Sequence, residues 1–72
     1  MKLHDWMKNE LWSHERLAKQ MSESTRTVEK WARGERYPRP HAQKKIIEVT
    51  NGLVTADDIL EAYLERNYWV SQ

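Results

Sequence analysis

The sequence predicts an all-α protein, a compact bundle of five helices. Apolar residues recur at spacings of three and four, and no stretch shows the sustained alternation that is typical of strands. The breaks between these stretches coincide with residues that interrupt helices, namely Gly34, Pro38, Pro40 and the pair Asn51-Gly52. A chain of 72 residues is long enough for one domain only.

Two helices are predicted in the first third of the chain. The first covers about Leu3 to Glu10. Ser13 can cap a second helix, which continues to about Met21. The apolar residues that these helices turn inward are Leu3, Trp6 and Met7 in the first and Leu17, Ala18 and Met21 in the second. We interpret Trp6, Trp12 and Trp31 as core residues, because aromatic burial stabilises a small fold efficiently.

A third helix is predicted from Thr25 to about Arg33. Ser24 can cap its start, and Gly34 is a favoured residue directly after a helix end. The turn before it is so short that the second and third helices must cross steeply. Val28 and Trp31 then face the second helix and anchor the third one inward.

Two further helices follow the proline-containing break. Pro40 suits the first turn of a fourth helix, which stops at Asn51-Gly52 and carries Ala42, Ile46 and Val49 on one face. Thr55 with Asp58 resembles a capping box at the start of a fifth helix. The apolar residues of the fifth helix are Ile59, Leu60, Tyr63 and Leu64. Residues from Asn67 onward either extend it or hang free, so we expect a domain over 1–67 and a tail over 68–72.

Several functional classes are disfavoured by composition. The chain has no cysteine, so it has neither a disulfide framework nor a thiolate zinc site. No apolar run approaches the roughly 18 residues of a membrane helix, and a signal-peptide core is missing. We therefore expect a cytoplasmic protein with no membrane partner.

We also expect no enzyme activity, no cofactor, no metal and no small-molecule substrate. His4, His14 and His41 are not paired at a ligand spacing, and we interpret them as surface or phosphate-contacting residues. Gly34 and Gly52 are isolated and form no phosphate-cradling loop. The serines are more simply explained as caps and turn residues.

Charge is distributed unevenly along the chain. The net charge is +1 overall, but residues 26–45 hold seven cations against two carboxylates, a net of +5. Residues 46–72 hold one cation against five carboxylates, a net of −4. A basic middle with an acidic tail indicates a polyanionic partner.

The third helix carries the residues suited to that partner. Its anchored register leaves Thr25, Arg26, Thr27 and Lys30 on the outward face of the first turn and a half. In a helix-turn-helix, this part of the second helix enters the major groove. Arginine can read guanine there, and threonine can contact thymine or a base edge. Arg33, Arg36 and Arg39 lie beyond the groove, where they would bind phosphates.

The run SHERLAKQMSESTRTVEKWARGERYPRP resembles the helix-turn-helix of the Cro/cI (XRE-type) repressors, and NGLVTADDI resembles the end of small phage Cro-like domains. The similarity covers roughly Leu3 to Ile59. The residues that carry it are Leu17, Ala18, Val28, Trp31 and Gly34. It implies a lambda-repressor-like DNA-binding fold and a phage or prophage-type repressor in a bacterial or phage-infected cell.

The resemblance also implies particular DNA contacts. The base-reading positions of the family fall on Thr25, Arg26, Thr27 and Lys30, and its helix-two start, often set against a phosphate, falls on His14. Together with the arginines, the full set of expected phosphate contacts is Ser13, His14, Arg33, Arg36, Tyr37 and Arg39.

Two residues depart from the pattern of this family. Ser22 stands where glycine is usual, and a left-handed conformation there costs about 1–2 kcal/mol relative to glycine. Glu23 stands where an apolar residue is usual, which removes a core contact and places an acid near the expected phosphates. The predicted bundle and its docking face are compatible with both changes.

The expected partner is double-stranded DNA, bound by a weak homodimer, because one such domain reads only a short half-site. Tyr68, Trp69 and Val70 either fold back on the core or form a partner surface. Two alternatives stay open: a DNA-binding antitoxin or excision-control factor of a mobile element, and a protein-interaction module on the same fold.

Overall fold

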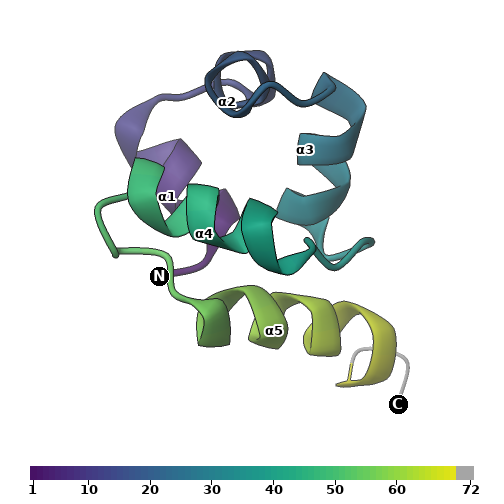
Figure 1. Cartoon of the computed structure of the whole chain (residues 1–72). Helices are drawn as coiled ribbons and strands as arrows, with labels where there is room; N and C mark the ends of the chain where they lie inside the picture. The colour runs from purple at the N-terminus through teal and green to yellow at the C-terminus, as the bar shows by residue number, and fades with distance from the viewer. Residues whose placement is uncertain (70–72) are drawn as a thin grey trace.

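The computed structural model describes residues 1–69, and every regular element within that range is helical (Figure 1). The all-α prediction is therefore confirmed. The elements are α1 (Leu3–Glu10), α2 (His14–Met21), α3 (Thr25–Arg33), α4 (Pro40–Val49), α5 (Ala56–Leu64) and a π-helical turn, η1 (Glu65–Trp69). No helix in the described range is long and apolar enough to cross a lipid bilayer.

Local capping explains where most of these helices begin. Ser13 Oγ accepts a hydrogen bond from the Arg16 N–H at 3.0 Å, and Ser24 Oγ accepts one from the Thr27 N–H at 3.1 Å. Thr55 and Asp58 form the predicted capping box, in which each side chain accepts a bond from the other residue's backbone N–H. These caps satisfy amides that a helix start leaves without an internal partner.

The core is assembled from the predicted apolar faces. Its buried hydrophobic residues are Leu3, Trp6, Met7, Leu17, Ala18, Met21, Val28, Trp31, Ala42, Ile46, Val54 and Ile59. Trp12 is half-buried and packs against this cluster, with its ring centroid 5.2 Å from that of Trp6. Thr50 is also buried, because its hydroxyl donates to the Ile46 carbonyl at 2.9 Å and accepts from the Val54 N–H at 3.2 Å.

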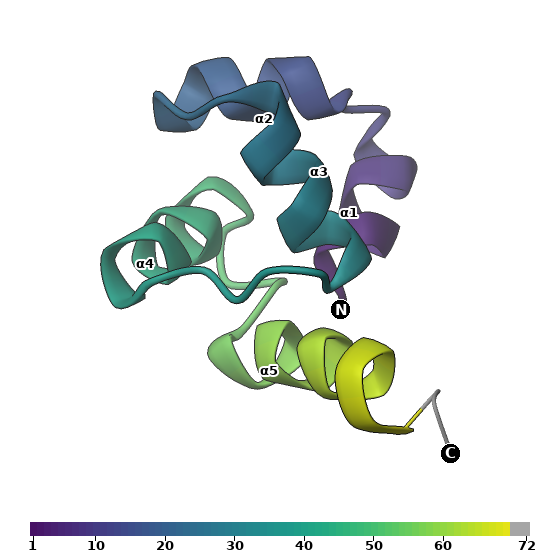
Figure 2. The ribbon, with the colours of Figure 1, turned by 90° about the vertical axis from the view of Figure 1, so that its right-hand side faces the viewer.

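α3 occupies the middle of the helical assembly. It packs against α1, α2 and α5, while α4 packs against α2 and α5. Figure 2 shows α3 facing the viewer, with α2 above it, α4 to its left and α5 beneath. One long side of α3 is consequently left open to solvent.

The turn between α2 and α3 contains a strained residue. Ser22 adopts the left-handed conformation with φ 56°, where a side chain costs about 1–2 kcal/mol relative to glycine. Its N–H bonds the Lys19 carbonyl at 3.3 Å, and the Glu23 N–H bonds the Ala18 carbonyl at 2.9 Å. The turn therefore closes α2 in the geometry that glycine normally supplies.

α5 approaches α3 most closely at Gly34. A Cβ atom there would lie 2.5 Å from the Ala62 carbonyl oxygen, and the φ of Gly34 is +75°. Of the apolar residues predicted for the fifth helix, Ile59 is buried and Tyr63 and Leu64 are half-buried, but Leu60 is 40% exposed. The side of α5 that packs against α3 at Gly34 is buried. Leu60 lies outside this side of the helix and is therefore exposed.

The C-terminal end of the fold is helical beyond the predicted domain boundary at residue 67. The backbone continues as the π-helical turn through Trp69. The Tyr68 ring lies 6.5 Å from the ring of Tyr63 in an edge-on arrangement. Val70, Ser71 and Gln72 lie outside the described residues, so the expected role of Val70 in a tail surface is not addressed by the structure.

Candidate nucleic-acid interface

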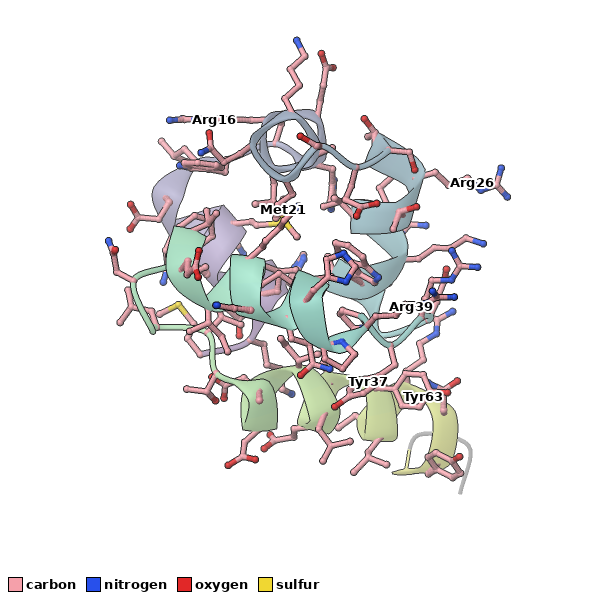
Figure 3. The ribbon with its side chains drawn as sticks, in the orientation of Figure 1. Arg16, Met21, Arg26, Tyr37, Arg39 and Tyr63 are labelled. Atoms are coloured by element: carbon pink, nitrogen blue, oxygen red, sulfur yellow. The ribbon has the colours of Figure 1, made fainter. Side chains whose placement is uncertain are left out.

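The open side of α3 presents the four predicted base-reading residues. Val28 is fully buried and Trp31 is 8% exposed, so these two side chains fix the rotation of the helix about its axis. The opposite side carries Thr25 and Arg26, which are exposed, and Lys30, which is half-buried. Thr27 is half-buried at the edge of that side, beside Trp31. Figure 3 shows Arg26 extending away from the body of the protein. The structure therefore places Thr25, Arg26 and Lys30 together on the solvent-facing side of α3, with Thr27 at its border with the neighbouring hollow.

Hydrogen bonds at the start of α3 determine how the Thr27 hydroxyl can bond to a ligand. Its Oγ1 accepts a hydrogen bond from the Ser24 hydroxyl at 2.8 Å, while the Thr27 N–H donates to Ser24 Oγ at 3.1 Å. The Thr27 hydroxyl hydrogen is thus left available to donate. Donation would suit an acceptor at a base edge, such as guanine O6 or thymine O4.

The seven cations of residues 26–45 are not engaged in ion pairs in the described part of the chain. One of them, Lys45, donates instead to the Met21 carbonyl at 3.3 Å. Of the two acids in that segment, Glu35 is already paired with Arg66 at 3.1 Å. The positive charge of this surface is therefore not neutralised by ion pairs within the described residues.

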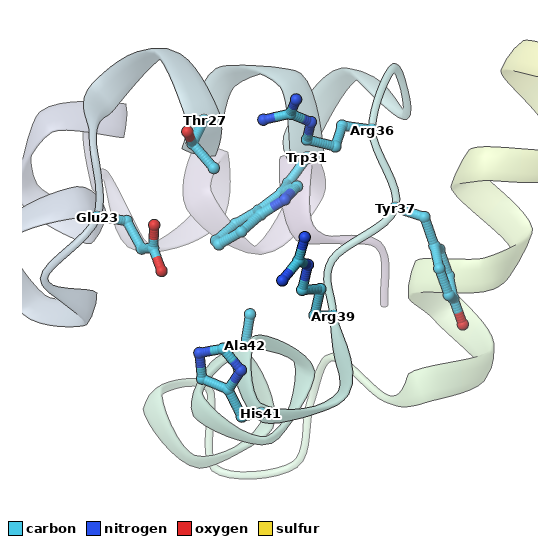
Figure 4. A pocket seen from close by; sticks show the side chains of 8 residues that line it. All are labelled: Glu23, Thr27, Trp31, Arg36, Tyr37, Arg39, His41 and Ala42. Atoms are coloured by element: carbon cyan, nitrogen blue, oxygen red, sulfur yellow. The ribbon is translucent and has the colours of Figure 1, made fainter.

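A hollow separates α3 from the start of α4. It has a volume of about 400 Å³. Figure 4 shows the side chains that line it, namely Glu23, Thr27, Trp31, Arg36, Tyr37, Arg39, His41 and Ala42. Arg36, Arg39 and His41 are exposed, and Glu23 is half-buried. The hollow is thus polar and mainly basic, with one carboxylate in its wall.

Tyr37 lies apart from the arginines beside it. Its ring packs against Tyr63 of α5, with centroids 5.4 Å apart, and it is 41% exposed. Figure 4 shows it pointing away from the other side chains of the hollow, toward α5. Of the predicted phosphate-contacting residues on this loop, Arg36 and Arg39 extend into solvent, whereas Tyr37 is partly engaged inside the protein.

The predicted contacts on α2 are at the far end of that helix from the turn into α3. Ser13 is exposed and caps the helix, and His14 is half-buried. α2 is eight residues and about 12 Å long, with these two residues at its start and the turn into α3 after its other end. Next to them the Arg16 guanidinium stacks 3.9 Å from the centroid of the Trp12 ring. This stacked cation was not predicted, because Trp12 precedes the helix and its contact with Arg16 depends on the path of the chain into α2.

Glu29 also belongs to the exposed part of α3 and was not predicted to matter. It is half-buried and lines a second hollow with Thr25, Arg26, Lys30, Arg33 and Glu35. Its positions three residues after Arg26 and four before Arg33 place it on their face. A carboxylate can accept from cytosine N4, so Glu29 adds a hydrogen-bond acceptor beside the donors Arg26 and Lys30.

The resolved pKa shifts lie away from this surface. A hydrogen bond to Glu65 raises the pKa of Lys2, and a hydrogen bond from the N-terminal ammonium lowers the pKa of Asp58. Both groups belong to the contact between the N-terminus and α5.

Comparisons of the chain with models of protein families, with curated proteins and with solved structures gave no match. The geometry and charge of the α3 surface are consequently the basis for assigning a function.

Proposed function

We propose that the protein is a sequence-specific binder of double-stranded DNA, with α2 and α3 acting as a helix-turn-helix, and that it regulates transcription by occupying an operator. The observation that carries this proposal is the solvent face of α3. Arg26 projects from its first turn, and uncompensated cations continue along the loop that follows. A helix of this kind fits the major groove of B-DNA, which is about 12 Å wide.

The proposal assigns different roles to the two parts of this surface. Arg26, Thr25, Thr27 and Lys30 face the base edges, where they choose the sequence. Arg33, Arg36 and Arg39 contact phosphates on the strands that border the groove, where they add affinity for any duplex. Arg26 is the residue best suited to guanine because a guanidinium can donate to O6 and N7 together.

We further propose that the protein binds DNA as a weak homodimer. One α3 reads only a few base pairs, which gives poor discrimination among the many competing sites of a genome. Two copies on an inverted repeat about one helical turn apart would double the sequence that is read. Selection of bound sequences from random duplex DNA would test this directly, and a single unpaired half-site in the selected sequences would contradict it.

The test of the DNA-binding function compares two arginines. Arg26→Ala should weaken binding to the selected operator by roughly 1–3 kcal/mol and relax preference at one or two base pairs. Arg36→Ala should weaken operator and random duplex equally and should reduce the salt dependence of binding. Titrations of labelled duplex at several salt concentrations measure both effects.

Lys8→Ala is the control, because Lys8 is an exposed cation on α1 outside the surface described above. Removal of the Lys8 side chain should leave the preference for base sequence unchanged. A protein-interaction module would show no salt-dependent duplex binding at all. Equal loss of affinity with unchanged preference in both arginine variants would mean that Arg26 does not enter the groove.

A further inference from the structure

The loop that carries Arg36 and Arg39 is held in place by contacts with the end of α5 and with η1. We call residues 34–39 the basic loop. Asn67 Nδ2 donates to the Gly34 carbonyl at 2.9 Å and to the Tyr63 carbonyl at 2.7 Å. Beside it, Arg66 Nη2 lies 3.1 Å from Glu35 Oε1. Asn67 thus joins the backbone that ends α3 to the backbone of α5.

Some of the remaining loop residues contact the body of the protein, and the others are exposed to solvent. Tyr37 stacks on Tyr63, and Pro38 is buried, with its carbonyl accepting from Gln43 Nε2 at 2.8 Å. Gly34, Glu35, Tyr37 and Pro38 are therefore held by α5, η1 and α4. Arg36 and Arg39 are exposed between them. The fastened residues set the directions in which the two arginines leave the backbone.

We propose that the segment from Tyr63 to Asn67 is a positioning element for DNA binding, with Asn67 and Tyr63 as positioning residues that need not touch DNA. The inference rests on the proposed DNA-binding function. A loop that is already ordered loses less conformational entropy on binding than a loop that DNA must order. Release of the basic loop should therefore weaken binding to every duplex sequence alike, while base preference, which comes from α3, stays the same.

Asn67→Ala tests the inference without changing any charge. Two readouts are needed. The first is amide hydrogen exchange of Glu35 and Arg36, whose N–H groups both bond the Lys30 carbonyl, at 2.9 and 3.4 Å. Exchange should become faster at these amides and stay unchanged in α2. The second is duplex affinity, which should fall roughly three- to tenfold for operator and random DNA, about the effect of losing one hydrogen bond.

Asn9→Ala is the matched control, because Asn9 is an exposed asparagine in the last turn of α1. Its side chain makes a long contact, 3.8 Å, with Met1 Sδ and no other hydrogen bond to the described part of the chain. It should change neither readout. Unchanged exchange in the Asn67 variant, or faster exchange with unchanged affinity, would overturn the inference. Failure of the unsubstituted protein to bind duplex DNA would overturn the DNA-binding function itself.

A second pair of variants separates positioning from direct charge effects. Arg66→Gln removes a cation and Glu35→Gln removes an anion, so direct attraction or repulsion by DNA would shift affinity in opposite directions. Both changes break the same ion pair. Release of the basic loop predicts faster exchange at the Glu35 and Arg36 amides in both variants. If exchange were unchanged in both variants, the Arg66–Glu35 pair would act on DNA only through its charges, and the proposal would be contradicted.

Discussion

Two side chains decide which residues of α3 meet solvent. Val28 and Trp31 are three positions apart and are both buried, so the helix cannot rotate without exposing one of them. Arg26 and Lys30 are directed outward as a result. The sequence predicts this division because it depends on helical spacing alone. The Ser24–Thr27 hydroxyl contact was not predicted, because it depends on side-chain rotamers.

Glu23 is the residue whose chemistry fits least well with the rest of the surface. It is half-buried in the wall of the hollow beside α3, and it forms no ion pair within the described residues. Its carboxylate lies on the side where we propose that phosphates run. A negative charge there repels the phosphates and weakens binding to duplex DNA of any sequence. The repulsion is stronger where water is partly excluded.

Glu23→Gln should therefore increase affinity for operator and random DNA by a similar factor, roughly three- to tenfold at low salt, because one like charge is removed. Salt titrations of both duplexes measure the change. Glu48→Gln, an exposed acid on α4, is the control and should have little effect. Weaker binding by the Glu23 variant would mean that this carboxylate accepts a hydrogen bond from DNA.

Among the elements, the helix ends were predictable and the contacts between distant elements were not. Ser13, Ser24 and the Thr55–Asp58 box act on their own helix, so a single stretch of sequence contains the whole signal. By contrast, the π-helical turn η1 lies against the loop after α3, some thirty residues earlier in the chain, through Asn67 and Gly34. Exposure of Leu60 has the same origin, because the approach of α5 to Gly34 sets which stripe is buried.

The two glycines allow this close approach to be tested. Both have positive φ, but a Cβ at Gly34 would meet the Ala62 carbonyl oxygen at 2.5 Å, whereas a Cβ at Gly52 would meet nothing within 4 Å. Gly52→Ala should lower the free energy of unfolding by about 1–2 kcal/mol through backbone strain. Gly34→Ala should cost a further ~1–3 kcal/mol through overpacking.

Denaturant unfolding of the two variants under identical conditions gives the comparison. Since both substitutions add the same methyl group at a left-handed position, their difference isolates the contact between α3 and α5. Equal destabilisation would show that α5 can move away from Gly34 at little cost.

Across the described part of the molecule, the acids near the C-terminal end form ion pairs, whereas the cations in the middle of the chain do not. Three acids of α5 and η1 are paired with the N-terminal residues: the Met1 ammonium lies 2.7 Å from Asp58 Oδ2, and Lys2 pairs with Glu61 and Glu65. In Figure 1 the N-terminus accordingly lies beside the start of α5. Within the described residues, the seven cations of residues 26–45 form no ion pair. The low net charge of the chain thus conceals a basic surface, which is where we propose that DNA binds.

The pairing at Asp58 makes stability depend on pH. Hydrogen bonds from the N-terminal ammonium and then from the Thr55 N–H lower the pKa of this carboxyl. The folded protein therefore binds the proton less readily than the unfolded chain does. The stabilisation is fully present above the ordinary aspartate pKa, and it is lost as pH falls through that value toward the lowered one.

Asp58→Asn should lower the melting temperature at neutral pH, because asparagine can still accept the Thr55 N–H bond but cannot pair with the ammonium. The difference from the unsubstituted protein should shrink as pH falls below about 4, where the carboxyl of the unfolded chain is largely protonated. Thermal unfolding followed by circular dichroism over a pH series measures it. Asp57→Asn is the control, since Asp57 is exposed and has no ion pair in the described part of the chain. If the difference caused by Asp58→Asn were the same at every pH, the capping geometry and not the ion pair would account for the contribution of Asp58.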